Sequence, residues 1–331
     1  MTPLASILLC TFQGEKYLQQ QLDSLLTQSY QNFNIYIFDD ASTDNTVRIV
    51  KKYLSLHTNI YLNINKQQLG FVRNFEHAIN MCLNQEKCHY FALCDQDDIW
   101  HKDKLFLSMR AMRILEINHP QKAALVHCNL RVVNDKLQEI APSFFDYKNI
   151  SLPSNTSVNK VLGYNGIMGN TLLINRHLAK ACLPFPKPLK YHDYWISLVN
   201  ELFGVRTTLA QTLIDYRIHQ NNISNNKNIT RKSKNWRFVS FSQLPPPFLS
   251  DKREYTMQHL LTHYPDLKDD DRLLLIQYQR YLTADMGRIE ALHFLFFKQF
   301  LKNGWKHKLS VFFRVLIYYP SFFKKKATTD K

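Results

Sequence analysis

The chain has 331 residues, of which 45% are hydrophobic and 13% aromatic, which suits one large domain with an appendage or two domains. Its eight glycines and twelve prolines argue against low-complexity sequence. The formal net charge of +15 is unevenly spread, since residues 298–331 hold nine Lys and Arg against one Asp. Such a basic tail indicates an anionic partner: nucleic acid, a membrane surface or acidic glycans.

The six cysteines are scattered and form no C-x-x-C pair, so we interpret them as core thiols in a reducing compartment. The first residues, MTPLASILLCTF, have an apolar run too short for a signal peptide or a membrane span and no positive region before it. We therefore expect a cytoplasmic protein, with peripheral binding to the inner face of the cytoplasmic membrane as the alternative.

The first third of the chain alternates between two hydrophobic periods. Buried strands are predicted at 4–10, 33–39, 59–65 and 89–94. Helical stripes lie between them, at 15–29, 42–54 and 70–83, and a further helix is expected from about residue 102. This alternation predicts an α/β fold with βαβ units and a mostly parallel central sheet flanked by helices.

The second half is less regular. A strand is predicted at 123–133, a strand followed by a helix at 169–182, a helix at 191–204, and one or two strands at 205–219. Residues 221–235 are polar and predict a loop, and a helix-rich C-terminus follows Pro245–Pro247.

Three polar clusters follow strands of the first third: TFQGE at 11–15, DDASTD at 39–44 and DQDDIW at 95–100. Ligands of parallel sheets bind at the carboxyl ends of the strands, so these clusters should meet in one cleft. Carboxylates as close as Asp95, Asp97 and Asp98 suit Mg²⁺ or Mn²⁺, which could hold a diphosphate leaving group. The alternative is a solvated acidic turn that caps the following helix.

Three further groups of residues have two interpretations each. Asp39 and Asp40 either cap the next helix or accept hydrogen bonds from a nucleobase or ribose. Asp193, in KYHDYWISL, is either a helix cap beside aromatic residues or a general base with a raised pKa. In DYRIHQNN, Arg217 and His219 could contact a diphosphate, and His219 fits a hydrogen-bonding role better than that of a lone metal ligand.

Taken together, the ordered stretches of residues 4–224 resemble the family 2 glycosyltransferases of the GT-A fold. They are SILLCTFQGEKYLQQQLDSLLTQSYQNFNIYIFDDASTDNT, LGFVRNFEHAI, FALCDQDDIWHKDKL, GNTLLINR, HDYWISL and YRIHQNN. The pattern is most similar to the bacterial rhamnosyltransferase-like branch. One departure is that His101 and Lys102 follow DDIW where the family usually has a proline.

The resemblance implies a role for each matching residue. Thr11 and Asp40, together with Arg73 in LGFVRNFEHAI, would bind the nucleotide of a nucleotide sugar. Asp95 and Asp97 would form a D-x-D element that touches ribose and metal, with Asp98 beside them. The metal ligands would be Asp97 and Asp98, although the resemblance does not decide which of the three carboxylates binds directly.

The same resemblance makes Asp193 the catalytic base and turns Arg217 and His219 toward the diphosphate. It implies an inverting, metal-dependent transferase that moves a sugar onto a glycan or lipid-linked glycan in bacterial surface polysaccharide or lipopolysaccharide synthesis. The first candidate for the sugar is L-rhamnose, with dTDP-L-rhamnose as donor. Alternatives are a UDP-hexose or UDP-N-acetylhexosamine transferase of the same fold, and a non-catalytic sugar-nucleotide-binding module. A phosphohydrolase would add His ligands, and we expect no nucleic-acid partner because no recognition motif accompanies the charge.

We expect a catalytic domain at 1–225 and a basic, aromatic, mainly helical region at 226–331. In the tail, Phe296, Phe297, Phe300, Leu301 and Trp305 fall near helical spacing, with Lys298, Lys302, Lys306 and Lys308 between them. This pattern predicts either a helix in an anionic membrane interface or a helix that packs its aromatic side chains on the catalytic domain.

Overall fold

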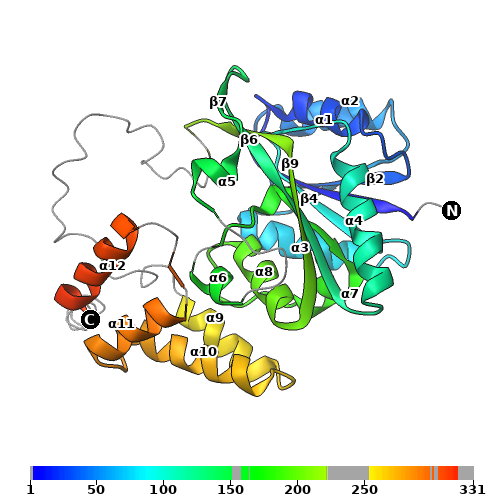
Figure 1. Ribbon diagram of the computed structural model, residues 1–331. Helices are drawn as coiled ribbons and strands as arrows, with labels where there is room; N and C mark the ends of the chain where they lie inside the picture. The colour runs from blue at the N-terminus through cyan, green and yellow to red at the C-terminus, as the bar shows by residue number, and fades with distance from the viewer. Residues whose placement is uncertain are drawn as a thin grey trace.

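The computed structural model describes residues 3–150, 158–163, 165–220, 222, 253–298, 300–301 and 305–319 (Figure 1). Its strands form one sheet with the order β3-β2-β1-β4-β8-β6-β9-β5, and β7 pairs with β6. The bounds of the strands are β1 Ala5–Thr11, β2 Phe33–Asp39, β3 Ile60–Ile64, β4 Tyr90–Cys94, β5 Ile99–Trp100, β6 Ala123–Asn134, β7 Glu139–Ala141, β8 Leu173–Asn175 and β9 Gly204–Ile218.

The helices follow most of the predicted ranges. They are α1 Leu18–Leu26, α2 Thr46–Leu54, α3 Phe71–Leu83, α4 Lys104–Asn118, α5 Phe144–Tyr147, α6 Val158–Gly163, α7 Arg176–Ala181, α8 His192–Phe203, α9 Arg253–His263, α10 Asp269–Leu282, α11 Arg288–Phe297 and α12 Trp305–Tyr318, with a short 3₁₀ turn, η1, at Gly169–Thr171. The expected α/β fold and the helical C-terminus are confirmed for the described residues. The predicted loop at 221–235 lies outside them, apart from Asn222.

The parallel part of the sheet is the predicted one, since β3, β2, β1 and β4 pair in parallel. The other half is mixed: β8 runs antiparallel to both β4 and β6, while β6 and β9 are parallel. A strand of two residues, β5, pairs antiparallel with β9 through Ile99↔Asp215 and Trp100↔Ile214. This pairing was not predicted, and it brings the residues just before Ile99 against the end of β9.

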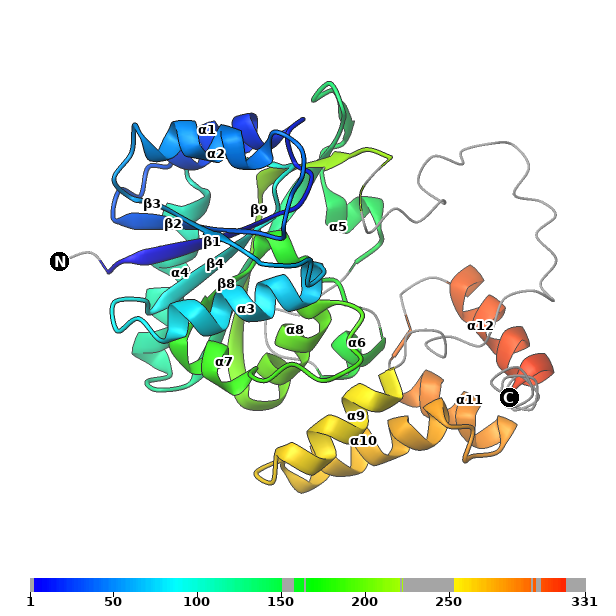
Figure 2. The same cartoon turned by 180° about the vertical axis from the view of Figure 1, so that it is seen from behind.

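Both faces of the sheet are covered, as its alternating side chains require. Leu8 points into a core shared with α3, α7 and α8, whereas Ile7 and Leu9 point into a core shared with α1, α2 and α4. Figure 2 shows α1 and α2 on one side of the sheet and α3, α7 and α8 on the other. The six cysteines are free thiols, and all but the half-buried Cys10 are buried, as core residues should be.

The C-terminal helices α9 to α12 pack on the side of the sheet that α3, α7 and α8 cover. Tyr264 donates a hydrogen bond of 2.6 Å to the carbonyl of Ala181, and Tyr278 donates one of 2.9 Å to the carbonyl of Leu162. Side chains of α9 to α12 belong to the same buried cluster as those of α3 and α8. The predicted boundary at 225/226 lies outside the described residues and stays a prediction. Among the described helices, none combines the length and the apolar character that crossing a bilayer requires.

Candidate active site

A cavity of about 710 Å³ lies at the carboxyl ends of the parallel strands, within the usual size for a small-molecule site. All three polar clusters contribute to it, through residues such as Thr11, Asp40 and Asp95. The opposite wall comes from η1, the start of α8 and the segment after β9, through residues such as Gly169, Asp193 and His219. The expectation that these segments converge in one cleft is therefore confirmed.

The three carboxylates of DQDD occupy different positions. Asp95 and Asp97 line the cavity, whereas Asp98 is fully buried and is not among the lining residues. The Asp98 carboxylate accepts hydrogen bonds from Asn170 Nδ2 at 2.5 Å and from the Arg217 amide at 3.1 Å. In this geometry Asp98 joins the loop after β4 to η1 and β9, and does not present its oxygens to a ligand.

The charges of this cluster are costly without a counter-ion. Burial, followed by the neighbouring charges of Asp97 and Asp193, raises the pKa of Asp95 to about 7. Burial and the charges of Asp97 and Asp95 also raise the pKa of Asp98 well above its usual value. Both shifts mean that burial and the neighbouring negative charges disfavour the ionised forms of these two carboxyls.

The carboxylates of this loop can hold a divalent cation only if the substrate supplies some of the ligand oxygens. Within the described part of the chain, no three His, Cys, Asp or Glu side chains are arranged to hold a metal. Asp95 and Asp97 are the two lining carboxylates of this loop. Mg²⁺ commonly uses one or two protein carboxylates and takes its other oxygens from water and substrate phosphates. The residues present therefore fit a metal held jointly with a diphosphate.

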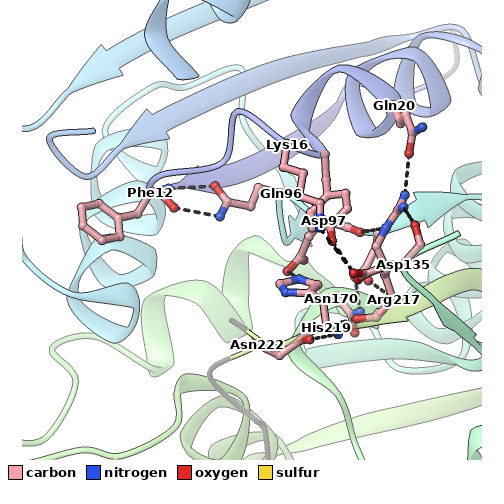
Figure 3. Close-up of polar contacts among 12 residues, drawn as sticks. Phe12, Lys16, Gln20, Gln96, Asp97, Asp135, Asn170, Arg217, His219 and Asn222 are labelled. Carbon is pink, nitrogen blue, oxygen red and sulfur yellow. Dashed lines mark hydrogen bonds and ion pairs between the residues drawn. The ribbon is translucent and has the colours of Figure 1, made fainter. Parts of the chain in front are cut away.

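His219 lies beside Asp97, as a hydrogen-bonding residue rather than a lone metal ligand. Its Nε2 is 2.8 Å from Asp97 Oδ2, and its ring lies 4.9 Å from that of Tyr17 (Figure 3). The amide of His219 donates to Asn222 Oδ1 at 2.5 Å. The contact with His219 orients the Oδ2 atom of Asp97.

Arg217 does not face the cavity, contrary to what the resemblance implied. Its guanidinium donates to the carbonyls of Asp97 at 2.9 Å and Asp135 at 3.0 Å, and to Gln20 Oε1 at 2.7 Å (Figure 3). It also lies 4.4 Å above the Tyr17 ring. The side chain is fully buried in these contacts, so its role in this structure is to hold the backbone of the D-x-D loop.

Replacing Arg217 with Ala should therefore destabilise the fold. The change leaves three acceptors unpaired, and hydrogen bonds from a charged group contribute about 1.5–3 kcal/mol each, so the free energy of unfolding should fall by at least about 3 kcal/mol. Urea denaturation measures this loss, with Lys16→Ala, an exposed neighbour, as the control. Unchanged stability with a raised KM for the donor would instead place Arg217 in contact with substrate.

Arg73 also lies away from the cavity. It forms an ion pair with Glu76 on the next turn of α3, at 2.5 Å. It donates hydrogen bonds to the carbonyls of Phe185 at 3.2 Å and Pro186 at 2.5 Å. Arg73 is not among the lining residues, so the described geometry gives it a structural role between α3 and the segment before α8.

Thr11 and Asp40 both line the cavity, and protein groups already orient them. The Thr11 hydroxyl donates to Asp39 Oδ2 at 2.8 Å. The Asp40 carboxylate accepts from the amides of Leu69 at 2.7 Å and Gly70 at 2.8 Å. Gly70 has a φ of +83°, a value that side chains disfavour. Asp40 thus shapes the loop before α3, which forms one edge of the pocket.

Asp193 lies in the first turn of α8 and accepts a hydrogen bond from the Tyr194 amide at 2.6 Å. Burial raises the pKa of its carboxyl to about 6, which is close to the value that a general base at neutral pH needs. The preceding His192 stacks on Phe75 at 4.2 Å, and burial lowers the pKa of its ring to about 3, so it is neutral. Of this pair, Asp193 is the group that can take up a proton.

The pH dependence of turnover should reflect this shift. If Asp193 must be ionised to act as base, kcat/KM should be constant above pH 7 and fall about tenfold per pH unit below its pKa of about 6. A pH–rate profile at saturating Mn²⁺ measures this. A profile that is flat down to pH 4.5 would contradict the assignment.

The structure also reveals residues that the sequence patterns did not single out. Gln96, between the two carboxylates, clasps Phe12 by accepting from its amide at 2.8 Å and donating to its carbonyl at 2.9 Å (Figure 3). A Cβ on Gly169 would come within 2.6 Å of His192 Nε2, so glycine leaves room for the HD pair. In the sequence, the only feature that pointed to Gln96 and Gly169 was that each lies within one of the recognised motifs.

Lys16 is the third such residue and the only Lys or Arg among the described lining residues. Its side chain is 65% exposed, and its ammonium lies 3.3 Å from Asp135 Oδ2. Asp135 also accepts a hydrogen bond of 2.8 Å from the Tyr17 hydroxyl. An exposed ion pair is weak, so Lys16 can exchange this partner for an anionic ligand.

Comparison with known sequences supports the interpretation of these motifs. A model of the family described as glycosyl transferase family 2 matches residues 6–116. An uncharacterized glycosyltransferase of Haemophilus influenzae is 26% identical over 88% of this chain and 90% of its own length. The UDP-Glc:alpha-D-GlcNAc-diphosphoundecaprenol beta-1,3-glucosyltransferase WfgD of Escherichia coli is 26% identical over 68% of this chain and 81% of its own. The dTDP-rhamnosyl transferase RfbG of Shigella flexneri is 38% identical over 29% of this chain and 34% of its own.

Solved structures support the fold. TarS 1–349 of S. aureus in complex with UDP-GlcNAc superposes with a TM-score of 0.58 at 16% identity, covering 93% of this chain and 78% of that one. The mannosyltransferase PcManGT of Pyrobaculum calidifontis, in complex with GDP-Man and Mn²⁺, gives 0.54 at 16% identity, covering 99% and 85%. The family match, the related sequences and the shared architecture lead to one conclusion: the chain is a glycosyltransferase of the GT-A fold whose residues 6–116 match family 2.

Proposed function

We propose that this enzyme transfers a sugar from a nucleoside diphosphate to a hydroxyl group of a glycan acceptor, with inversion at the anomeric carbon. One observation carries the proposal. Two carboxylates of a D-x-D element, Asp95 and Asp97, share a cavity with the half-buried carboxylate of Asp193, which has a raised pKa. The first two suit a diphosphate with its cation, and the third suits removal of a proton from the acceptor.

The residues divide this work as follows. Thr11 and Asp40 lie on the wall proposed to receive the nucleobase and ribose, with Asp95 next to the ribose. Asp193 accepts the proton of the acceptor hydroxyl as its oxygen forms the bond to the anomeric carbon, and the bond from that carbon to the diphosphate breaks. A single displacement of this kind inverts the configuration. Its transition state is oxocarbenium-like, as in glycoside hydrolysis.

Asp95 and Asp97 are proposed to hold Mg²⁺ or Mn²⁺ together with the diphosphate. When bound, the cation neutralises the charge that develops on the departing nucleoside diphosphate. His219 keeps Asp97 oriented, through the hydrogen bond of 2.8 Å between them. Asp98, Arg217 and Arg73, for which the family resemblance implies contact with metal or donor, are proposed to support the loops that carry these ligands.

Lys16 is proposed to contact the diphosphate in place of Arg217. Lys16→Ala should raise the KM for the donor about tenfold, because an exposed charge pair contributes about 1 kcal/mol and a diphosphate carries more charge than one carboxylate. The folding stability should stay within about 0.5 kcal/mol of wild type, as for other surface changes. Initial-rate kinetics measures this KM, with Asp135→Asn as the matched control. The control removes the ion pair but keeps the Lys16 ammonium, so it shows whether the ammonium itself contacts the donor. An unchanged KM would leave Lys16 without this role.

The proposed donor is dTDP-L-rhamnose, with a UDP-hexose or UDP-N-acetylhexosamine as the second candidate. The resemblance to the rhamnosyltransferase-like branch and the match to RfbG favour the first. The match to WfgD spans a larger share of the chain and favours the second. The name of WfgD includes a diphosphoundecaprenol-linked acceptor, so we propose a lipid-linked glycan as acceptor, in the synthesis of a surface polysaccharide or lipopolysaccharide on the cytoplasmic side of the membrane.

A donor panel tests the proposal. The full chain is incubated with dTDP-rhamnose, UDP-glucose, UDP-GlcNAc and GDP-mannose, each with Mn²⁺ or EDTA and with lipid-linked bacterial glycans as acceptors. Release of nucleoside diphosphate is followed, and the product linkage is assigned by NMR. Release from one donor that EDTA abolishes, with an inverted linkage, supports the proposal. Donor binding without release from any donor would favour the non-catalytic module, and a retained configuration would overturn the single displacement.

A further inference from the structure

The aromatic side chains of the C-terminal tail divide into two groups. Phe294 and Phe300 are buried against Tyr278: the Phe300 ring stacks on it at 5.2 Å between centroids, and the Phe294 ring is tilted against it at 6.2 Å. These two residues therefore pack on α10, within the C-terminal region itself, whereas the sequence predicted packing either in a membrane interface or on the catalytic domain. The expected continuous helix through 296–305 does not form, because α11 ends at Phe297 and α12 begins at Trp305.

Helix α12 has an inner and an outer face. On the inner face Val311 and Val315 are fully buried, and so is Tyr319, which follows directly after the helix at the same spacing of four residues. The Tyr319 hydroxyl donates a hydrogen bond of 3.0 Å to the carbonyl of Tyr281, and the two rings stack at 5.2 Å. This face attaches the helix to the rest of the C-terminal region.

The outer face is also apolar, which a helix at the surface of a protein in water does not need. Its side chains are 38% to 50% exposed and follow the spacing i, i+3, i+4, i+7, i+8: Leu309, Phe312, Phe313, Leu316 and Ile317. We name these five residues the outer stripe. Such a contiguous apolar patch commonly marks a surface that binds a protein or a membrane.

The net charge of the sequence that contains the outer stripe favours one kind of partner. Residues 298–331 hold nine Lys and Arg against one Asp, and exposed Lys308 directly precedes Leu309. A second copy of the chain would bring two such basic segments together, which their repulsion disfavours. An acidic glycan would satisfy the charge but leave the stripe in water. An anionic lipid surface satisfies both, because its headgroups attract lysines and its acyl boundary accepts aromatic and aliphatic side chains.

The position of α12 fits this partner. In both Figure 1 and Figure 2, β1 runs from the N-terminus toward the end of the molecule where α12 lies. The cavity is at the carboxyl end of β1, so the cavity and α12 are at the same end. We propose that α12 lies in the interface of an anionic bilayer with the outer stripe inserted, which docks the catalytic cavity close to the membrane surface.

Vesicle flotation of the full chain tests this docking. The stripe variant Phe312→Asp/Phe313→Asp is compared with wild type and with the control Ile114→Asp/Ile117→Asp, which places the same charges at two exposed residues of α4. Vesicles are phosphatidylcholine alone or mixed with phosphatidylglycerol. Wild type and control should float with the anionic vesicles, and less so at high salt. The stripe variant should bind at least about tenfold more weakly.

Two further measurements keep the outcomes distinct. Thermal unfolding confirms that each variant is folded, and Phe312→Ser/Phe313→Ser replaces the stripe variant if the aspartates destabilise α12. Sedimentation velocity without lipid reports the oligomeric state. Docking is overturned if wild type does not float on anionic vesicles, or if the stripe variant floats equally well. It is also overturned if wild type is a dimer that the stripe variant converts to monomer while neither binds vesicles, since the outer stripe would then contact a second copy.

Discussion

Asp193→Asn should lower kcat by about 10²–10⁴-fold, the usual contribution of a general base. The amide has the shape of the carboxyl and can still accept the hydrogen bond from the Tyr194 amide, but it cannot take up a proton. The fold and the affinity for nucleotide should therefore stay close to wild type. Single-turnover kinetics measures the loss, and calorimetric titration with the nucleoside diphosphate provides the control for binding.

The pH profile makes this test specific. In wild type the fall of kcat/KM on the acid side follows the carboxyl whose pKa is raised to about 6, and the residual activity of Asp193→Asn should lack that limb. Since the ionised form is the active one, activity is lost as the pH falls through this pKa. A variant within a few-fold of wild type, or one that keeps the acid limb, would remove Asp193 from the role of base.

Asp97→Asn should lower kcat/KM by at least about 100-fold at fixed Mn²⁺, because a bound cation stabilises the developing charge by several kcal/mol. Part of the loss should be recovered at higher Mn²⁺, since the amide weakens the site without removing its oxygen. Turnover measured as a function of Mn²⁺ concentration gives both effects. Full activity in excess EDTA would contradict a metal role for the cluster.

Asp98→Asn is the matched control for Asp97→Asn. Asp98 is the next residue and carries the same side chain, but its carboxyl is buried against Asn170 and the Arg217 amide. Its pKa is raised well above the usual value, so a neutral side chain costs less there. We expect a smaller loss of activity than for Asp97→Asn and no change in the Mn²⁺ dependence. A Mn²⁺ dependence that shifts equally in both variants would restore Asp98 as a ligand.

Much of this site could be predicted from the sequence alone because its signals are local. The alternation of strand and helix periods determines the parallel half of the sheet, and the rule that ligands bind at strand ends then places Thr11, Asp40 and Asp95 in one cleft. Asp193 had two interpretations, a helix cap or a general base, and the family resemblance implied the second. The chain itself therefore determined which backbone segments form the cavity.

Only the tertiary structure decided which side chains of those segments face the cavity. β5 has two residues, too few for a recognisable period, yet its pairing with β9 turns Asp98 and Arg217 inward and leaves Asp97 and His219 at the surface of the pocket. Orientation depends on partners far away in the sequence, such as Gln20 for Arg217 and Phe185 for Arg73. The same holds for the tail. The spacing of residues 296–305 predicted one amphipathic helix, but α11 ends at Phe297 and α12 begins at Trp305. Packing against Tyr281 then decides which face of α12 is buried.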